Sequence, residues 1–425
     1  MLPRFCLYGF LKNQRYFEAF LVLALLDRGL DFFAIGLLIA TRAGVVLLLE
    51  IPSGAIADGW GRRASLVAAF LAYVASFLLL GLADTVAWLV LGMALYGVGD
   101  SFRSGAHKAL IFAWLMTQNR QEERTRIYGF TRAWSKRGSA LSVLLGAGLV
   151  LALGRDAYRW LFLAAALPSA LAALNMLGYP ASLEAAPAAD RRPPLATLLS
   201  DAWREVRISV REPARRRLAV AAMGFDGVFE IVKDYLQPVL QGIAVAGAGA
   251  WLLAAANAAT LDDAQRAAVL IAPVYAGLFL LAASASRRAH RLVDRFTRRD
   301  SDTADPEARA ARALWQIALM LYALLTLAAA LRLHALLAAG LIALHGLHNL
   351  WRPVLIARFD RVADAARGAT ALSIEGQAKR LAVLVGAPLI GLLVDGAMRV
   401  DAPPLLPVAA LGLFASTAAL VARTR

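Results

Sequence analysis

The chain has 425 residues, of which 60% are hydrophobic, with a mean hydropathy of +0.60 and a formal charge of +15. This apolar content excludes an ordinary soluble domain and indicates a protein with several membrane-spanning segments. Cys6, the single cysteine, excludes an intrachain disulfide, and no Cys/His cluster has zinc-ligand spacing. We therefore expect neither a metal nor a cofactor.

The excess of basic residues is explained by their placement relative to the membrane. Most lysines and arginines fall in alternate loops between the apolar segments, as the positive-inside rule requires. This distribution predicts that both termini are cytoplasmic, and it makes a nucleic-acid partner unnecessary. The first apolar segment has no cleavage site after it and is expected to remain as an uncleaved insertion signal.

Apolar segments of about 20 residues predict twelve transmembrane helices. The first contains Lys12-Asn-Gln-Arg15, which interrupts its apolar character. The expected spans are 5–27, 33–57, 64–83, 86–115, 126–153, 157–179, 217–241, 266–286, 313–331, 335–357, 368–394 and 404–422.

A proline- and arginine-rich stretch divides the chain in two. Residues 180–216 are expected to form a cytoplasmic linker between an N-terminal bundle, 1–179, and a C-terminal bundle, 217–425. Within the linker, apolar residues at helical spacing predict an amphipathic helix on the inner leaflet: Leu195, Leu198, Leu199, Ala202, Trp203 and Val206. The Ala/Gly-rich residues 242–265 are expected to form a long external connection.

A charged hinge joins the second and third predicted helices and reads Gly54-Ala-Ile-Ala-Asp58-Gly-Trp-Gly61-Arg62-Arg63-Ala-Ser-Leu66. We interpret Gly54 as permitting close helix approach, and Arg62 and Arg63 as holding the turn at the cytoplasmic side. The spacing resembles the G-x-x-x-D-x-x-G-R-[KR]-x-x-L signature of the major facilitator superfamily. The resemblance implies an all-α membrane protein with twelve transmembrane helices in two pseudo-symmetric six-helix bundles.

The same resemblance implies a secondary transporter that works by alternating access around a midplane site. Helices 1, 4, 7 and 10 would line the cavity, and 5 and 11 would flank it. Asp58 would lock the cytoplasmic side against the start of helix 11. The conformational gate is thus predicted to comprise Gly54, Asp58, Gly61, Arg62 and Arg63. The chain departs from drug/proton antiporters, because helix 5 has no Gly-Pro-x-x-Gly-Gly pattern.

The two halves repeat weakly at three places. Residues 96–103 match 345–352, with a glycine, an aromatic residue and an arginine in register, and 135–137 match 378–380. The hinge recurs at 290–299, with the aspartate and the arginine pair but without both glycines.

Charged residues within the predicted spans are too costly to face lipid, at about 2.5–3.5 kcal/mol each, and must line a polar interior. Basic groups outnumber acids there, which favours an anionic or zwitterionic solute held between Arg103 and Arg352. The competing interpretation is that most of these charges pair across helices as structural locks. The predicted substrate-binding residues are Arg15, Arg103, His107, Lys136, His348, Asn349, Trp351, Arg352 and Lys379.

Acids in the same helices suggest proton coupling, because desolvated carboxylates can titrate near neutrality. The candidates are Glu18, Asp100, Asp226 and Glu230, whereas Glu375 is interpreted as the partner of Lys379 four residues later. His345 and His348 share a helix face, and polar lining is preferred over a metal site.

The sequence thus predicts a monomeric, proton-coupled secondary transporter of a small organic anion or zwitterion in the cytoplasmic membrane. The alternative is a proton-driven exporter of amphiphilic drugs or toxic compounds, attracted by the acidic residues of helix 7. An enzyme is not expected, because no Walker A sequence, nucleophile elbow or zinc signature is present.

Overall fold

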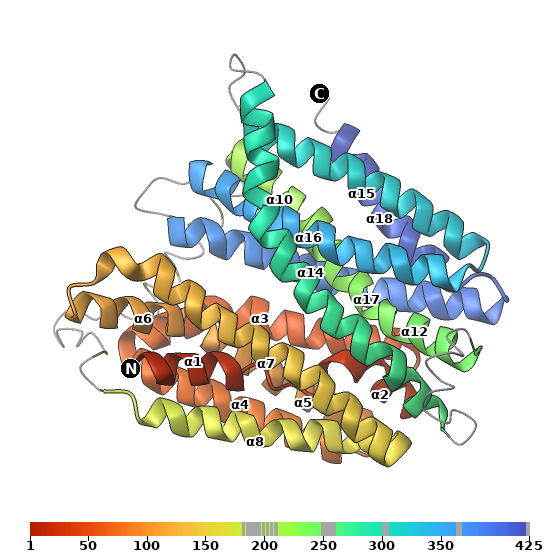
Figure 1. The fold of residues 1–425 in the computed structure, drawn as a ribbon, viewed down its shortest axis with the longest axis horizontal. Coiled ribbons are helices and arrows are strands. Elements are labelled where there is room, and N and C mark those ends of the chain that lie inside the picture. Colours follow the sequence, from red (N-terminus) through yellow and green to blue (C-terminus); the bar gives the residue numbers. More distant parts are fainter. Residues whose placement is uncertain are drawn as a thin grey trace. The chain divides into compact units, whose positions relative to one another are not determined.

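The computed structural model describes residues 1–180, 211–247, 261–299, 306–362 and 368–421, with isolated positions between 183 and 207. Every regular element in these ranges is helical, which confirms the expected all-α architecture (Figure 1). Each of the twelve predicted spans coincides with described helical residues. The chain forms two compact units: residues 1–24 with 41–204, and residues 25–40 with 205–425.

The first 180 residues form helices in close succession, and α4 packs between α5 and α8. Their bounds are α1 (Leu2–Leu11), η1 (Glu18–Phe20), α2 (Leu21–Asp27), α3 (Phe32–Trp60), α4 (Arg62–Leu82), α5 (Val86–Arg103), α6 (Ala106–Thr117), η2 (Gln121–Glu123), α7 (Arg124–Leu153), η3 (Gly154–Asp156) and α8 (Ala157–Leu177).

The later helices are longer, except where the predicted span 217–241 divides into short segments. Their bounds are α10 (Pro213–Ala222), the π-helical segment η6 (Met223–Gly227), α11 (Val228–Val232), η7 (Lys233–Tyr235), α12 (Leu236–Val245), α14 (Asp263–Arg299), α15 (Pro306–Ala330), α16 (His334–Val362), α17 (Gly368–Arg399) and α18 (Leu406–Val421).

Six continuous helical segments of the described chain are long and apolar enough to cross a membrane. They cover predicted spans 2, 3, 8, 9 and 11, and one segment joins spans 5 and 6. The other five spans do not meet this requirement of length and apolar composition. Spans 1, 4 and 7 are divided into shorter helices, span 10 carries histidines and arginine, and α18, in span 12, has only 16 residues.

The first span is discontinuous, and the continuous helix expected over 5–27 is corrected to two segments. Helix α1 ends at Leu11, and regular helix resumes only at Glu18. Two amide side chains attach this break to α7. Asn13 donates to the Ser135 carbonyl and the Ser139 hydroxyl at 2.8 and 2.9 Å, and Gln14 donates to the Gly138 carbonyl at 3.1 Å.

Glycines of α7 permit this close approach. A Cβ placed on Gly138 would lie 2.5 Å from the Phe10 carbonyl oxygen, whereas one on Gly148 would meet no described heavy atom within 4 Å.

We therefore expect Gly138→Ala to destabilise the protein by about 1–3 kcal/mol through overpacking. Gly148→Ala on the same helix is the matched control and should leave stability unchanged or slightly raised, because alanine favours helix. Thermal unfolding of the two purified variants checks this, and equal melting temperatures would contradict it.

The fourth span is also interrupted, at Ser104–Gly105, where the expectation of one helix over 86–115 is wrong. Gly105 has φ of +71°, a left-handed conformation that glycine adopts without a Cβ penalty. Arg103 therefore ends α5, and His107 belongs to a separate helix, α6. In contrast, the repeat-related Arg352 lies inside the continuous α16.

Two aspartates determine where α3 begins. The Asp31 carboxylate accepts from the Ala34 amide at 2.8 Å, as an N-cap does, and the Asp395 carboxylate of α17 accepts from the Phe32 and Phe33 amides at 3.0 and 2.8 Å. Gly391 of α17 allows the approach, since a Cβ at that position would clash with the Phe32 carbonyl oxygen. Residues 25–40 accordingly belong to the second unit, unlike the expected boundary at 179.

Two predicted segments lie wholly or mostly outside the described residues. They are the amphipathic helix of the 180–216 linker and most of the external connection 242–265. The weaker hinge copy at 290–299 has a described backbone, and it continues α14 as helix to Arg299.

Candidate functional site

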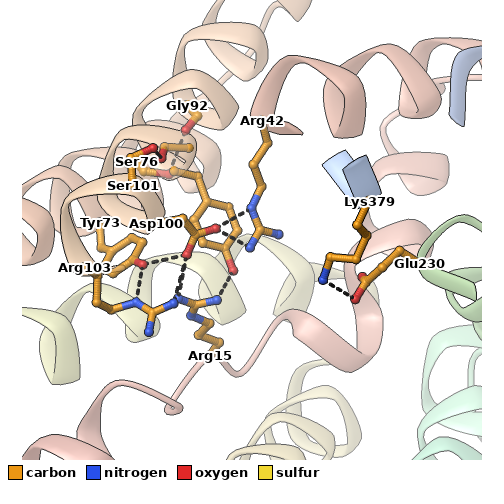
Figure 2. Close-up of polar contacts among 12 residues, drawn as sticks. Arg15, Arg42, Tyr73, Ser76, Gly92, Asp100, Ser101, Arg103, Glu230 and Lys379 are labelled. Atoms are coloured by element: carbon orange, nitrogen blue, oxygen red, sulfur yellow. Dashed lines mark hydrogen bonds and ion pairs between the residues drawn. The ribbon is translucent and has the colours of Figure 1, made fainter. Parts of the chain in front are cut away.

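Three arginines converge on the carboxylate of Asp100 in the first unit (Figure 2). Arg42 of α3 donates to Oδ2 through Nε and Nη2 at 2.9 and 2.5 Å. Arg15, from the break of the first span, and Arg103, at the end of α5, place an Nη2 atom 3.5 and 3.4 Å from Oδ1. Asp100 therefore links helices 1, 2 and 4 of the predicted topology.

Two tyrosines complete this cluster. The Tyr73 hydroxyl of α4 donates to Asp100 Oδ1 at 2.6 Å and accepts from Arg103 Nε at 2.8 Å. The Tyr96 hydroxyl accepts from Arg15 Nη1 at 2.7 Å, and the Arg42 guanidinium lies 3.7 Å from the centre of the Tyr96 ring. Stacking on an aromatic face suits arginine because its planar cation is weakly hydrated.

The cluster carries a surplus of positive charge. Three guanidinium groups face the single Asp100 carboxylate, and the Glu18 carboxylate interacts electrostatically with Arg15 and Arg42. Three positive against two negative charges leave one positive. The Asp100 side chain is 8% exposed, whereas those of Arg42 and Arg103 are 30% and 26% exposed. Arg42 and Arg103 are therefore accessible, while Asp100 is enclosed.

The other predicted residues of the first unit lie apart from the Asp100 cluster or are largely exposed. His107 is buried, stacks on Tyr8 at 3.5 Å between ring centres, and lies 3.2 Å from the Tyr179 hydroxyl. It therefore packs an aromatic core, which removes it from the groups that a solute can touch in this conformation. Glu18 and Lys136 are both exposed.

In the second unit, Glu230 of α11 is held by two lysines. Its carboxylate lies 2.9 Å from Lys233 and 3.4 Å from Lys379 of α17, and the latter contact appears in Figure 2. All three side chains are 20–29% exposed. Lys379 is thus bound to Glu230, and Glu375 lies instead 3.8 Å from Arg352, so the expected Glu375–Lys379 pair is wrong.

Asp226 lies in the π-helical segment η6, a widened turn of the kind often found at functional sites. Its Oδ1 atom is 2.8 Å from His348 Nε2 of α16, and its Oδ2 atom accepts from the Trp351 indole at 3.4 Å. His348 stacks on Phe229 and Trp351 on Phe225. Trp351 is fully buried, so it supports Asp226 and is removed from the surfaces that a solute can contact in this conformation.

Asn349 donates to the His345 carbonyl one turn earlier at 2.7 Å, and the Arg352 side chain is 43% exposed. Of the predicted substrate-binding residues, Arg15 and Arg103 are brought together in the first unit. His348, Arg352 and Lys379 lie near a set of acids in the second. Within the described ranges, no group of three or more His, Cys, Asp or Glu residues is arranged to hold a metal ion.

The predicted gate is tighter than the sequence suggested. Helix α3 runs through Asp58 to Trp60 and α4 begins at Arg62, so only Gly61, with φ of 104°, separates them. Gly54 is exposed, and no described heavy atom lies within 4 Å of its Cβ position, so its role in close helix packing stays a prediction. Arg63 donates to the Leu177 carbonyl of α8. The Asp58 side chain lies outside the described residues.

Sequence reasoning missed three residues of the Asp100 cluster, Arg42, Tyr73 and Tyr96. Arg42 lies in the middle of the apolar span 33–57, where a lone arginine is itself a functional signal. Tyr73 has no comparable signal, because a tyrosine in an apolar span is usual in membrane proteins.

Helices of membrane-spanning length with charged residues enclosed among the described helices indicate a multi-pass membrane protein. The sequence profile of the Major Facilitator Superfamily matches residues 13–387. The chain belongs to this family.

The curated relatives match short stretches. "Inner membrane transport protein YajR" of Escherichia coli (strain K12) is 26% identical over 159 residues, 36% of this chain and 34% of that protein. "Uncharacterized MFS-type transporter YxaM" of Bacillus subtilis (strain 168) is 30% identical over 90 residues, 21% and 23% of the two chains. The chain therefore spans about a quarter to a third of the length of these relatives.

Solved structures resemble the whole chain. A mutant of the nucleoside transporter NupG aligns with a TM-score of 0.74 at 13% identity, covering 100% of this chain and 98% of that one. A D-xylose–proton symporter aligns with a TM-score of 0.61 at 15% identity, covering 98% and 95%. At these identities the likeness establishes the fold alone.

Proposed function

We propose that this chain carries a small organic anion or zwitterion across the cytoplasmic membrane and that a proton gradient drives the transport. It acts as a monomer with both termini in the cytoplasm, by alternating access. Secondary transport follows from the family, and the substrate class rests on one observation. That observation is the positive surplus of Arg15, Arg42 and Arg103 around the enclosed Asp100, in which Arg42 and Arg103 are accessible.

An acidic solute group fits this cluster because guanidinium forks match the planar geometry of carboxylate and the oxygens of phosphate. Asp100 occupies Nε and Nη2 of Arg42, and only Nη2 of Arg103. An incoming anion would share these donors with Asp100 and neutralise the remaining positive charge. Tyr73 and Tyr96 keep the guanidinium groups in place while Asp100 gives up part of its contacts.

Export of amphiphilic cations has less support. It was suggested by the acids of helix 7, but Glu230 is bound by Lys233 and Lys379, and Asp226 is fully buried beside His348. A lipophilic cation would have to displace two lysines to reach Glu230.

A thermal-shift panel on the purified protein tests the substrate class. We expect some of succinate, phosphate, glycerol phosphate and glutamate to raise the melting temperature, and ethidium and tetraphenylphosphonium to leave it unchanged. Arg42→Gln should abolish the shift, because the remaining cluster has two positive and two negative charges. Arg137→Gln, an exposed arginine stacked on Trp134, is the control and should retain it. Stabilisation by the lipophilic cations alone would refute an anionic or zwitterionic substrate.

A further inference from the structure

Among the buried polar atoms of the second unit that lack an aligned hydrogen bond to any described residue, three lie on neighbouring helices: Asp226 Oδ1, His348 Nε2 and Glu375 Oε1. Asp226 has no exposed surface, Glu375 is 3% exposed and His348 is 9% exposed. Asp226 Oδ1 and His348 Nε2 are nevertheless only 2.8 Å apart, and Glu375 interacts electrostatically with both residues. Buried polar groups left in this way are rare and call for a physical explanation.

Asp226, His348 and Glu375 form a second cluster with Arg352, and the net charge of this cluster provides a physical explanation. Two carboxylates, Asp226 and Glu375, face one guanidinium, Arg352, at 3.8 Å from Glu375. With His348 neutral, these four side chains hold one net negative charge, and a single added proton cancels it. A buried uncompensated charge is costly, so the cluster has a physical reason to bind that proton.

The neighbouring charges make release of the proton equally feasible. Glu230 with Lys233 and Lys379 carries one surplus positive charge close to the cluster, and Lys379 interacts electrostatically with Glu375. Of the other elements packed against η6, α10 contributes Arg215, which pairs with Glu212 at 2.7 Å, and α18 contains no charged residue. His345 donates through Nδ1 to the Leu341 carbonyl of its own helix at 2.9 Å. Without the added proton, the negative charge of the cluster is offset by this positive surplus, and with it the cluster is neutral by itself.

We propose that Asp226, His348 and Glu375 together form the site that takes up and releases the transported proton. This inference rests on the proposed proton coupling and assigns it to particular residues. The proton enters from water onto one of the three groups and leaves to water, and no covalent bond changes. Glu230 is excluded as the carrier because two lysines already neutralise it, and Asp100 because its protonation would leave three guanidinium groups without their counter-ion.

The π-helical segment supplies the means of changing access to this site. Gly227 brings it against α17, since a Cβ there would lie 2.5 Å from the Ala382 Cβ. A π-turn contains one more residue than an α-turn, so its conversion to α-helix rotates the residues beyond it by about 100°. Such a rotation would turn Asp226 away from His348 and separate the groups that share the proton.

Difference infrared spectroscopy of the purified full-length protein, between about pH 5 and about pH 8, tests the assignment with the proton itself as the probe. We expect a protonated-carboxyl band and an imidazole band to appear on acidification. The carboxyl band should be lost or shifted in Asp226→Asn and Glu375→Gln, and the imidazole band in His348→Gln. His345→Gln, one turn away on the same helix face, is the control and should retain both bands.

The outcomes separate the two levels of the proposal. No pH-dependent band in the unmutated protein would refute proton coupling itself. Bands that persist in all three variants but vanish in Glu230→Gln would overturn the assignment and leave proton coupling intact. Should the neutral variants fail to fold, the midpoint pH of the infrared bands is measured on Asp226→Glu and Glu375→Asp instead. A shifted midpoint pH supports the assignment, and an unshifted midpoint in both overturns it.

Discussion

Replacing Asp100 by alanine is expected to destabilise the protein by about 3–5 kcal/mol, because three guanidinium groups lose the carboxylate that they share. Removing one partner of an enclosed ion pair costs far more than the pair itself contributes, since the remaining charges stay desolvated. Chemical unfolding of the detergent-purified variant, compared with the unmutated protein, measures the effect.

Two further variants isolate the cause. Glu123→Ala removes a carboxylate that accepts from Arg120 at 2.6 Å at the surface, so its loss should leave the stability nearly unchanged. The double variant Asp100→Ala/Arg42→Ala should recover part of the lost stability because one unpaired cation is removed with the anion. If Asp100→Ala alone unfolds like the unmutated protein, the cluster does not stabilise the fold in the way described.

Replacing Arg103 or Arg352 by lysine is expected to weaken substrate binding at least tenfold, equivalent to about 1.4 kcal/mol. Lysine keeps the positive charge but has no planar fork for a carboxylate or phosphate. The structure predicts different effects on stability. Arg103→Lys loses the 2.8 Å hydrogen bond to Tyr73 and should melt earlier, whereas Arg352 is 43% exposed and only 3.8 Å from Glu375, so Arg352→Lys should melt nearly unchanged.

Affinity and melting temperature, measured together on each variant, decide between a ligand-binding and a structural role. The anion that most stabilises the unmutated protein in the thermal-shift panel serves as the ligand. Arg332→Lys, at an exposed arginine paired with Asp401, should change neither quantity appreciably. Unchanged affinity in both Arg103→Lys and Arg352→Lys would refute direct contact with the solute, and a lower melting temperature alone would assign Arg103 to structure.

Much of the fold was predictable because the bilayer imposes a simple rule. A spanning segment must satisfy its own backbone hydrogen bonds and expose apolar side chains, so runs of about 20 apolar residues predict helices directly. The hinge from Gly54 to Leu66 is local in sequence, and its signature indicated the family before any helix was placed. The cost of a charge in lipid likewise pointed to Arg15, Asp100, Asp226 and Glu230 as interior residues.

The interruptions of the helices were less predictable. The polar run after Leu11 indicated a disturbance of the first span, but the actual break is stabilised by Asn13 and Gln14 binding to α7, 120 or more residues away. The break at Gly105 and the π-turn at Asp226 have no comparable local signal. A single glycine costs only about 1 kcal/mol in a helix relative to alanine, so tertiary packing decides whether the helix continues.

By itself, the sequence determined the all-α membrane architecture, the family and the set of charges that must avoid lipid. Only the tertiary structure decided which charges meet. Arg42 joins Asp100 from a span not expected to contribute, and Glu375 lies beside Arg352 rather than its helical neighbour Lys379. The physical reason is that a pair between helices depends on the rotation and depth of each helix. The rotation and depth of each helix are set by packing contacts, such as Gly138 against Phe10 and Gly227 against Ala382. Such contacts follow no periodic pattern in the sequence and cannot be read from it.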